Sequence, residues 1–275
     1  MNPITFSTLA CPSWTIETII VKASEMGFDG IEWRGGAQGH VQPEMPAVQK
    51  TTLRQMSLDA GLMAIAVTAY TSFVSEEEQR ANLDELRRYA DLAAELGASY
   101  VRAFLGELPD GTIPDSKMYR MMSESLSAAS AYALKAGVKI AVEPHDNFAR
   151  SSVIAPVFND SQTHPALRVI WDIGNAFATG ENPAEGFDLL KDRLAYVQVK
   201  DGKGREPNWQ LCPLGEGDIP LAQAFELLLA NGYPGAFSVE WGYADHPELD
   251  PPEIALPNSL RTVRKLLAAA QPESS

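Results

Sequence analysis

Residues 134–145 read LKAGVKIAVEPH, and this stretch joins the end of a helical pattern to a short apolar strand that finishes on a carboxylate. Gly137 can adopt the left-handed conformation that closes a helix, and the strand follows within two residues. The same helix–glycine–strand junction recurs at four other glycines, Gly27, Gly61, Gly97 and Gly232. Because strands that alternate with helices run parallel, five such junctions predict a parallel sheet covered by helices.

Eight apolar stretches are predicted to be strands, at residues 4–9, 30–34, 63–69, 100–104, 139–143, 168–173, 195–200 and 236–241. Helical patterns fill most of the gaps, at residues 15–26, 45–60, 76–96, 116–136, 184–191, 221–230 and 254–269, with only a short helix expected in 151–164. Eight such units in 275 residues match a single (β/α)₈ TIM barrel. An open doubly wound sheet is the alternative, but STLACPSW after the first strand lacks a glycine-rich phosphate turn. We therefore predict one barrel at residues 1–270 and a frayed tail at 271–275.

The composition argues against several classes of function. The formal net charge is −14 and the chain has no run of Lys or Arg, so we expect no nucleic-acid partner, because phosphate binding needs clustered cations. No segment is long and apolar enough to cross a bilayer, and the N-terminus lacks a signal-peptide pattern. Cys11 and Cys212 offer neither a disulfide framework nor metal-ligand spacing. We expect a cytoplasmic protein with no membrane partner.

Four successive strands in the second half of the chain finish on oxygen donors. The segments KIAVEPH, VIWDIGN, YVQVKD and FSVEWG place four residues there, Glu143, Asp172, Gln198 and Glu240. Adjacent strands lie about 5 Å apart, and the carboxyl ends of barrel strands meet at one face, so these donors should converge. Three carboxylates that close repel one another unless a cation neutralises them, although some could bond solvent or loop amides instead. An all-oxygen set favours one Mg²⁺ or Mn²⁺ ion, with Co²⁺ or Zn²⁺ as alternatives.

The order of these motifs resembles a known family. Taken together, FDGIEWR, VEPHDN, VIWDIGNAF, VQVKD, PLGEGDIP and SVEWGY resemble the xylose-isomerase-like TIM-barrel superfamily, the sugar phosphate isomerase/epimerase group. The resemblance spans nearly the whole chain and implies that Glu143, Asp172, Gln198 and Glu240 bind the metal. It also implies that Glu143 and Glu240 are opposed acid/base residues. Many ketose epimerases have histidine at the positions of Asn175 and Gln198, whereas a glutamine ligand is typical of hydroxypyruvate-isomerase-like members.

The resemblance implies an activity as well as a metal site. We expect a divalent-metal-dependent isomerase or epimerase of a small sugar, sugar phosphate or hydroxy-keto acid that reacts through a metal-stabilised enediolate. Loss of a β-hydroxyl at the same site would instead make a lyase of the inosose or 3-dehydroshikimate dehydratase type. A non-catalytic sugar-binding barrel is the alternative of another class, which Glu143 and Glu240 disfavour because binding alone needs no opposed bases. The resemblance also allows a homo-oligomer.

Four further residues are candidates for binding a small carbohydrate, His145, Asn175, Lys200 and Arg205. His145, two residues after Glu143, could donate a hydrogen bond to substrate or be a structural imidazole. Lys200 could hold an anionic substrate group or pair with Asp201. Arg205 resembles loop arginines that reach substrate oxygens in the family, or could be a solvated loop residue.

Two charged residues end the second predicted strand, Glu32 and Arg34. The sequence leaves two interpretations open, because oppositely charged neighbours can pair with each other or face a pocket.

Overall fold

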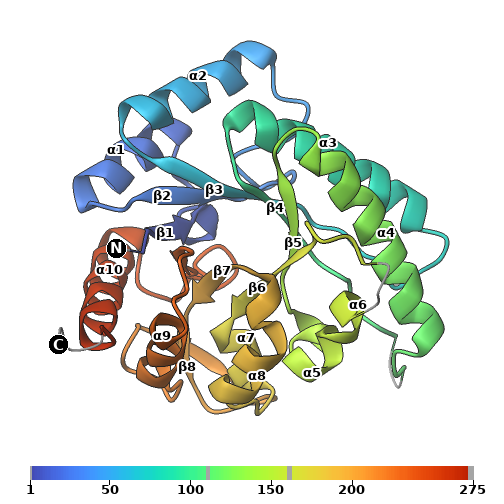
Figure 1. The fold of residues 1–275 in the computed structure, drawn as a ribbon. Coiled ribbons are helices and arrows are strands. Elements are labelled where there is room, and N and C mark those ends of the chain that lie inside the picture. The colour runs from blue at the N-terminus through green and yellow to red at the C-terminus, as the bar shows by residue number, and fades with distance from the viewer. Residues whose placement is uncertain (1, 110–111, 160–162, 272–275) are drawn as a thin grey trace.

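Eight parallel strands form a closed barrel, in the order β1-β10-β7-β6-β5-β4-β3-β2 (Figure 1). The structure is a computed structural model that describes residues 2–109, 112–159 and 163–271. The barrel strands are β1 (Ile4–Ser7), β2 (Gly30–Trp33), β3 (Met63–Thr68), β4 (Tyr100–Ala103), β5 (Lys139–Val142), β6 (Arg168–Asp172), β7 (Leu194–Val199) and β10 (Phe237–Val239). The predicted (β/α)₈ barrel is confirmed. The tail predicted at 271–275 lies outside the described residues except for Gln271.

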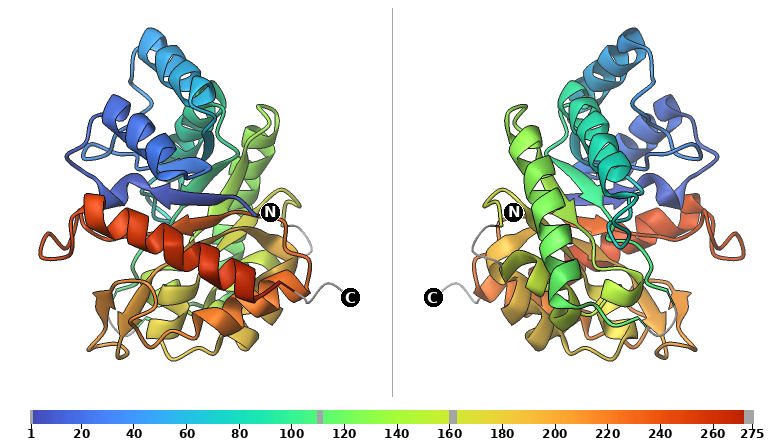
Figure 2. Two further views of the ribbon diagram at one scale, coloured as in Figure 1. Left: turned by 90° about the vertical axis from the view of Figure 1, so that its left-hand side faces the viewer. Right: turned by 90° about the vertical axis from the view of Figure 1, so that its right-hand side faces the viewer.

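Helices cover the outside of the barrel. They are α1 (Ile16–Met26), α2 (Ala47–Asp59), α3 (Gln79–Leu96), α4 (Ser116–Leu134), α5 (Ser151–Ile154), α6 (Pro156–Asn159), α7 (Ile173–Ala178), α8 (Pro183–Leu190), α9 (Leu221–Ala230) and α10 (Pro252–Ala269). Short 3₁₀ turns are η1 (Thr8–Ala10), η2 (Asp146–Phe148) and η3 (Lys191–Arg193). The long helix α10 packs against β1 and β10 and so covers the seam where the two ends of the chain meet (Figure 2). No helix in the described ranges is long and apolar enough to cross a membrane.

The glycine junctions fold as their sequence predicts. Gly27 has φ +86° and ends α1, where its N–H donates to the carbonyl oxygens of Ala23 and Ser24. Gly137, in the stretch that joins α4 to β5, has φ +78°. A side chain at either position would strain the backbone, because L-residues rarely adopt a positive φ. These turns bring each strand back into the barrel with its carboxyl end at the same face.

Two elements at that face were not predicted. Helix α7 follows β6 without a loop, and Asp172 caps it by accepting a hydrogen bond from Asn175 N at 2.9 Å. A two-stranded antiparallel hairpin, β8 (Asp201–Lys203) with β9 (Gln210–Cys212), follows β7. Strands of three residues are too short to show an alternating pattern in the sequence. Both elements lie beside the predicted metal site.

Candidate functional site

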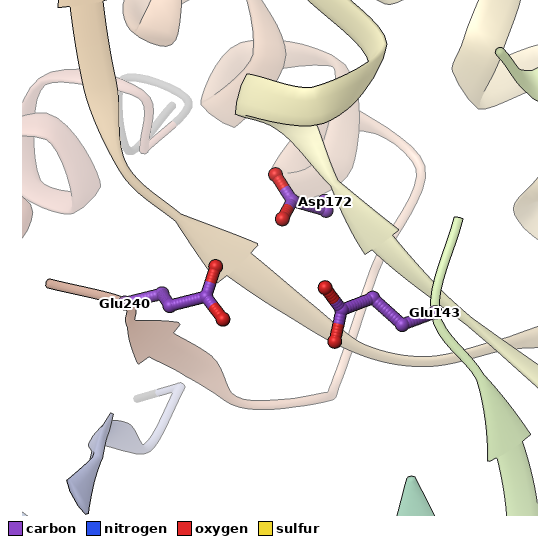
Figure 3. Close-up of side chains that lie close together, drawn as sticks. All are labelled: Glu143, Asp172 and Glu240. Atoms are coloured by element: carbon purple, nitrogen blue, oxygen red, sulfur yellow. The ribbon is translucent and has the colours of Figure 1, made fainter. Parts of the chain in front are cut away.

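Three carboxylates converge at the carboxyl ends of the barrel strands (Figure 3). Glu143 directly follows β5, Asp172 ends β6, and Glu240 directly follows β10. One oxygen of each lies within 4.8 Å of the others, and their exposed fractions are 1%, 0% and 8%. Glu143 and Glu240 point toward one another from opposite sides, with Asp172 between them (Figure 3). The structure thus brings together the three acids that the sequence analysis singled out.

Gln198, the fourth predicted ligand, lies on β7 and pairs in register with Asp172 on β6. Its Nε2 donates to Glu32 Oε1 at 3.1 Å. Its Oε1 is buried and finds no hydrogen-bond partner in the described part of the chain. A buried polar atom without a partner costs free energy, so such an atom in a native site calls for a ligand or a bound ion. Gln198 therefore offers a free oxygen one strand away from Asp172.

A buried arginine neutralises Glu143. Arg102 on β4 donates from Nη1 to Glu143 Oε2 at 2.8 Å, and the side chains are 5% and 1% exposed. The guanidinium carbon lies 3.8 Å from the ring centroid of Phe104, which holds the group flat against the barrel wall. Sequence reasoning missed Arg102, although a cation inside the apolar strand YVRA was a usable signal.

A second cation, Lys200, lies between the other two acids. Its Nζ is 2.7 Å from Asp172 Oδ2, contacts Glu240 Oε2, and donates to Asn175 Oδ1 at 3.1 Å. The predicted alternative of a Lys200–Asp201 pair is wrong. The Asp201 carboxylate instead accepts three backbone N–H bonds, from Gly202, Gly215 and Gly217, because the turn after the hairpin wraps around it.

Glu32 is fully buried inside the barrel beneath these residues. Its carboxylate accepts hydrogen bonds from Tyr196 Oη at 2.9 Å, Gln198 Nε2 at 3.1 Å and Ser238 Oγ at 2.7 Å. No ion pair joins it to Arg34 among the described residues, and Arg34 lies instead 3.9 Å from Asp245. Glu32 thus does not pair with its neighbour, and it bonds side chains inside the barrel without lining the cavity at the site.

The charges of this interior do not balance within the described chain. Two cations, Arg102 and Lys200, face four buried carboxylates, Glu32, Glu143, Asp172 and Glu240. With all six groups ionised, the excess is two negative charges, which equals the charge of one divalent cation. Buried charges without compensation are costly, so the donor set fits an Mg²⁺- or Mn²⁺-type ion in both chemistry and charge.

Burial and neighbouring charges shift the pKa values of these acids. Burial raises the pKa of Asp172 to about 7, although the ammonium group of Lys200 opposes the shift. Burial likewise raises the pKa of Glu32 to about 7, and the nearby charge of Glu240 adds to it. Burial alone would also raise the pKa of Glu240, but Lys200 outweighs it and holds that pKa below its ordinary value. Without a bound cation, two of these acids therefore take up protons near neutral pH.

A cavity of about 700 Å³ reaches the site at Glu240. Three of the predicted substrate-binding residues line it together with Glu240, namely His145, Asn175 and Lys200, and Trp209 from the loop between β8 and β9 forms part of the wall. The fourth, Arg205, is not among the lining residues. Its guanidinium lies 3.5 Å from the ring centroid of Phe177 and donates to the Phe177 carbonyl oxygen. Its role as a substrate contact stays a prediction.

His145 borders this cavity beside Glu143. Burial lowers the pKa of its imidazole, but the hydrogen bond that the ring donates to Asp146 and the charge of Glu143 outweigh burial and raise this pKa overall. Nδ1 lies 2.9 Å from Asp146 Oδ1, and the ring centroid lies 4.7 Å from that of Phe104. The ring is thereby held beside Glu143, where it can donate a hydrogen bond into the cavity.

Comparison with known proteins identifies a matching family and related enzymes. A family model described as a xylose isomerase-like TIM barrel matches residues 20–266. The chain is 27% identical over 241 residues to fructoselysine 3-epimerase of Escherichia coli O157:H7, covering 82% of this chain and 85% of the relative. It is also 27% identical over 241 residues to 3-dehydroshikimate dehydratase of Pseudomonas putida, covering 83% of this chain but 36% of that protein.

Solved structures share the fold at lower sequence identity. The IOLI protein, whose crystal structure contains a zinc atom, has a TM-score of 0.81 at 17% identity, covering 97% of this chain and 98% of its own. A xylose isomerase-like TIM barrel protein from Mycobacterium smegmatis in complex with magnesium has a TM-score of 0.73 at 18% identity, covering 98% of each chain. Barrels of this shape thus occur with either metal.

Proposed function

The chain belongs to the xylose isomerase-like TIM barrel family, and from that premise we propose that it is a divalent-cation-dependent isomerase or epimerase of a small sugar. The observation that carries the proposal is the convergence of Glu143, Asp172 and Glu240 beside the unpartnered Oε1 of Gln198. The related epimerase and dehydratase are enzymes, which supports an enzyme over a binding protein.

Glu143, Asp172, Gln198 and Glu240 would hold the cation. Hard oxygen donors and the excess of two negative charges favour Mg²⁺ or Mn²⁺, while the zinc in one structural neighbour keeps Zn²⁺ as an alternative. A bound divalent cation would stabilise the negative charge that develops on adjacent carbonyl and hydroxyl oxygens of a sugar.

Glu143 and Glu240 would transfer the proton. Their carboxylates face each other across the site, so one can take a proton from a sugar carbon while the other lies on its opposite side (Figure 3). Return of the proton by the opposite carboxylate inverts that carbon, and return at the neighbouring carbon moves the carbonyl. Lys200, which contacts Glu240, favours the ionised form that a base needs. Arg102 neutralises the charge of Glu143 on the other side.

The cavity favours a substrate without negative charge. Three acidic residues line its mouth, Glu206, Asp245 and Glu248. Lys200, the one lysine or arginine among the lining residues, is engaged by carboxylates of the site. A phosphate or carboxylate group would therefore meet like charge without a free cation, which costs binding energy. We propose an uncharged or cationic sugar, with His145 and Asn175 hydrogen-bonding its hydroxyl groups.

A lyase is the second candidate, favoured by the 27% identity to a dehydratase. The same proton removal next to a carbonyl would then be followed by loss of a β-hydroxyl group. The two activities differ in their product and not in their first step, so one assay can separate them.

The test is a panel of ketoses and aldoses in D₂O with Mg²⁺, Mn²⁺ or Co²⁺, followed by NMR. We expect deuterium to enter one carbon of a substrate as an isomer or epimer forms, and product formation to be strongly reduced in both Glu143→Gln and Glu240→Gln. Full exchange and turnover in both variants would contradict the proposed proton transfer. A dehydrated product would favour the lyase. A sugar that binds tightly in calorimetry but shows no exchange with any metal would contradict both and favour a binding protein.

A further inference from the structure

Glu32 is the charged residue of the interior that the proposed reaction does not use. It is 0% exposed and lies on β2, on the opposite side of β1 from β10 and β7. Its three hydrogen-bond donors are all neutral and all belong to β7 and β10. A carboxylate buried without a directly bonded cation is destabilising, so its presence calls for a role that a neutral side chain could not fill.

The contact between Glu32 and Gln198 can select one orientation of the Gln198 amide. A glutamine amide has a donating end and an accepting end of nearly the same shape, so packing alone hardly distinguishes its two orientations. An ionised carboxylate only accepts hydrogen bonds, and therefore binds the Nε2 end. With Nε2 held by Glu32 at 3.1 Å, Oε1 is the end left without a partner.

The opposite orientation would impair cation binding. With the amide reversed, its N–H groups would face the side of Asp172, where they could donate to carboxylates of the cluster and repel a cation. That arrangement would be favourable without metal, because the cluster carries excess negative charge. Glu32 competes against it by offering the N–H groups a carboxylate on the other side.

We propose that Glu32 is a positioning residue for the cation site: it holds Nε2 of the Gln198 amide and so leaves Oε1 as the end that is available to a cation. The inference rests on the proposed function, since it requires a cation beside Gln198. Tyr196 and Ser238 hold the Glu32 carboxylate in place through its two oxygens. Groups that orient a metal ligand in this way typically contribute 10- to 100-fold to affinity.

The experiment is a double-mutant cycle read by Mn²⁺ calorimetry at pH 8. Glu32→Gln should weaken Mn²⁺ binding by about 10- to 100-fold in the wild-type background. In a Gln198→Leu background, where no amide remains to be oriented, it should weaken binding by no more than about twofold. Equal weakening in both backgrounds would overturn the proposal, because Glu32 would then act through its charge alone. No weakening in either would overturn it as well.

A swap provides a rescue. In Glu32→Gln combined with Gln198→Glu, the amide at position 32 donates to the new carboxylate, total charge is kept, and an oxygen again faces the cation. We expect Mn²⁺ affinity within about tenfold of wild type, and affinity as weak as in Glu32→Gln alone would contradict the proposal. The swap also serves if Glu32→Gln does not fold, which thermal unfolding in chelator would reveal.

Tyr196→Phe is the matched control, because it removes a hydrogen bond to the same Glu32 oxygen but leaves the Gln198 contact. It should weaken Mn²⁺ binding less than Glu32→Gln does, and an equal loss would assign the effect to general packing. Failure of the wild-type protein to bind Mn²⁺, Mg²⁺, Co²⁺ or Zn²⁺ would reject the proposed function itself. Wild-type binding with an unaffected Glu32→Gln variant rejects only the role of Glu32.

Discussion

The two halves of the barrel carry different chemistry at the same face. Strands β5, β6, β7 and β10 bring the four predicted ligands, Glu143, Asp172, Gln198 and Glu240. Strands β1 to β4 bring no residue of that set, but they contribute Arg102, which bonds Glu143, and Glu32, which bonds Gln198. The second half thus brings the four proposed donors together with Lys200, and the first half adds one cation and one carboxylate that bond two of these donors. A barrel makes this division possible because closure brings the two halves across one interior.

The largest effect on activity is expected from substitution of the two proposed proton-transferring residues of the second half. Glu143→Gln and Glu240→Gln keep size and hydrogen-bonding shape but cannot act as bases. We expect each to lower kcat by about 10²- to 10⁴-fold, the range for lost general acid–base catalysis. Turnover of the sugar identified in the D₂O panel is the measurement. Calorimetry with Mn²⁺ is the control, because a variant that has also lost its cation would not isolate the proton transfer.

The next largest effect is expected on stability, from a substitution in the first half. Arg102→Met leaves Glu143 buried without its cation, which should lower the free energy of unfolding by about 3–5 kcal/mol in the metal-free protein. Chemical denaturation in chelator measures it. Arg88→Met is the matched control, because Arg88 pairs with Glu85 on the exposed face of α3 and is 51% exposed. There we expect a loss of about 1 kcal/mol or less. Similar losses at both positions would contradict a special role for the interior pair.

The sequence predicted the second half of this comparison better than the first. Carboxylates at the ends of apolar strands stood out because the strand pattern itself fixes their position. Glu32 and Arg102 also break apolar strands. Arg102 meets Glu143 from the neighbouring strand, but the partners of Glu32 lie on β7 and β10, and the spacing from Glu32 to Gln198 is 166 residues. Only barrel closure determines such contacts. The fold needed less information, since the glycine junctions are local and each predicted barrel strand lies within a few residues of the observed one.

The unexpected α7 and the β8–β9 hairpin show the same limit. Helix α7 begins at Ile173, directly after β6, so no turn residues separate the two elements and the sequence does not indicate where the helix begins. The hairpin places Trp209 at the cavity and Arg205 against Phe177, 28 residues earlier in the chain. A residue's contacts across loops follow from tertiary packing, which is why Arg205 was assigned from resemblance alone.

The stabilisation by a bound cation should depend on pH, through one acid of each half. Asp172 and Glu32 have pKa values raised to about 7 in the metal-free fold, above about 4 for an unfolded carboxyl group. Their contribution to stability is therefore full below about pH 4 and lost as pH rises toward 7. A cation needs the ionised acids and restores stability there, by about 2.7 kcal/mol at 100 times its Kd. The rise in Tm on adding Mn²⁺ should be larger at pH 8 than at pH 5, and an equal rise at both would contradict a site made of these acids.

The smallest expected effect concerns the mouth of the cavity, where Glu206 and Glu248 are exposed. Exposed charges interact weakly through solvent, so each should change the preference between an uncharged ketose and its phosphate by a few-fold at most. Glu206→Gln with Glu248→Gln should raise kcat/KM for the phosphate about threefold or more at low salt while leaving the uncharged ketose nearly unchanged. The gain should shrink in 0.5 M NaCl because salt screens the repulsion. A wild-type enzyme that prefers the phosphate would contradict the proposed substrate class. The proposed proton transfer by Glu143 and Glu240 would still stand, because it does not depend on the acidic residues at the mouth of the cavity.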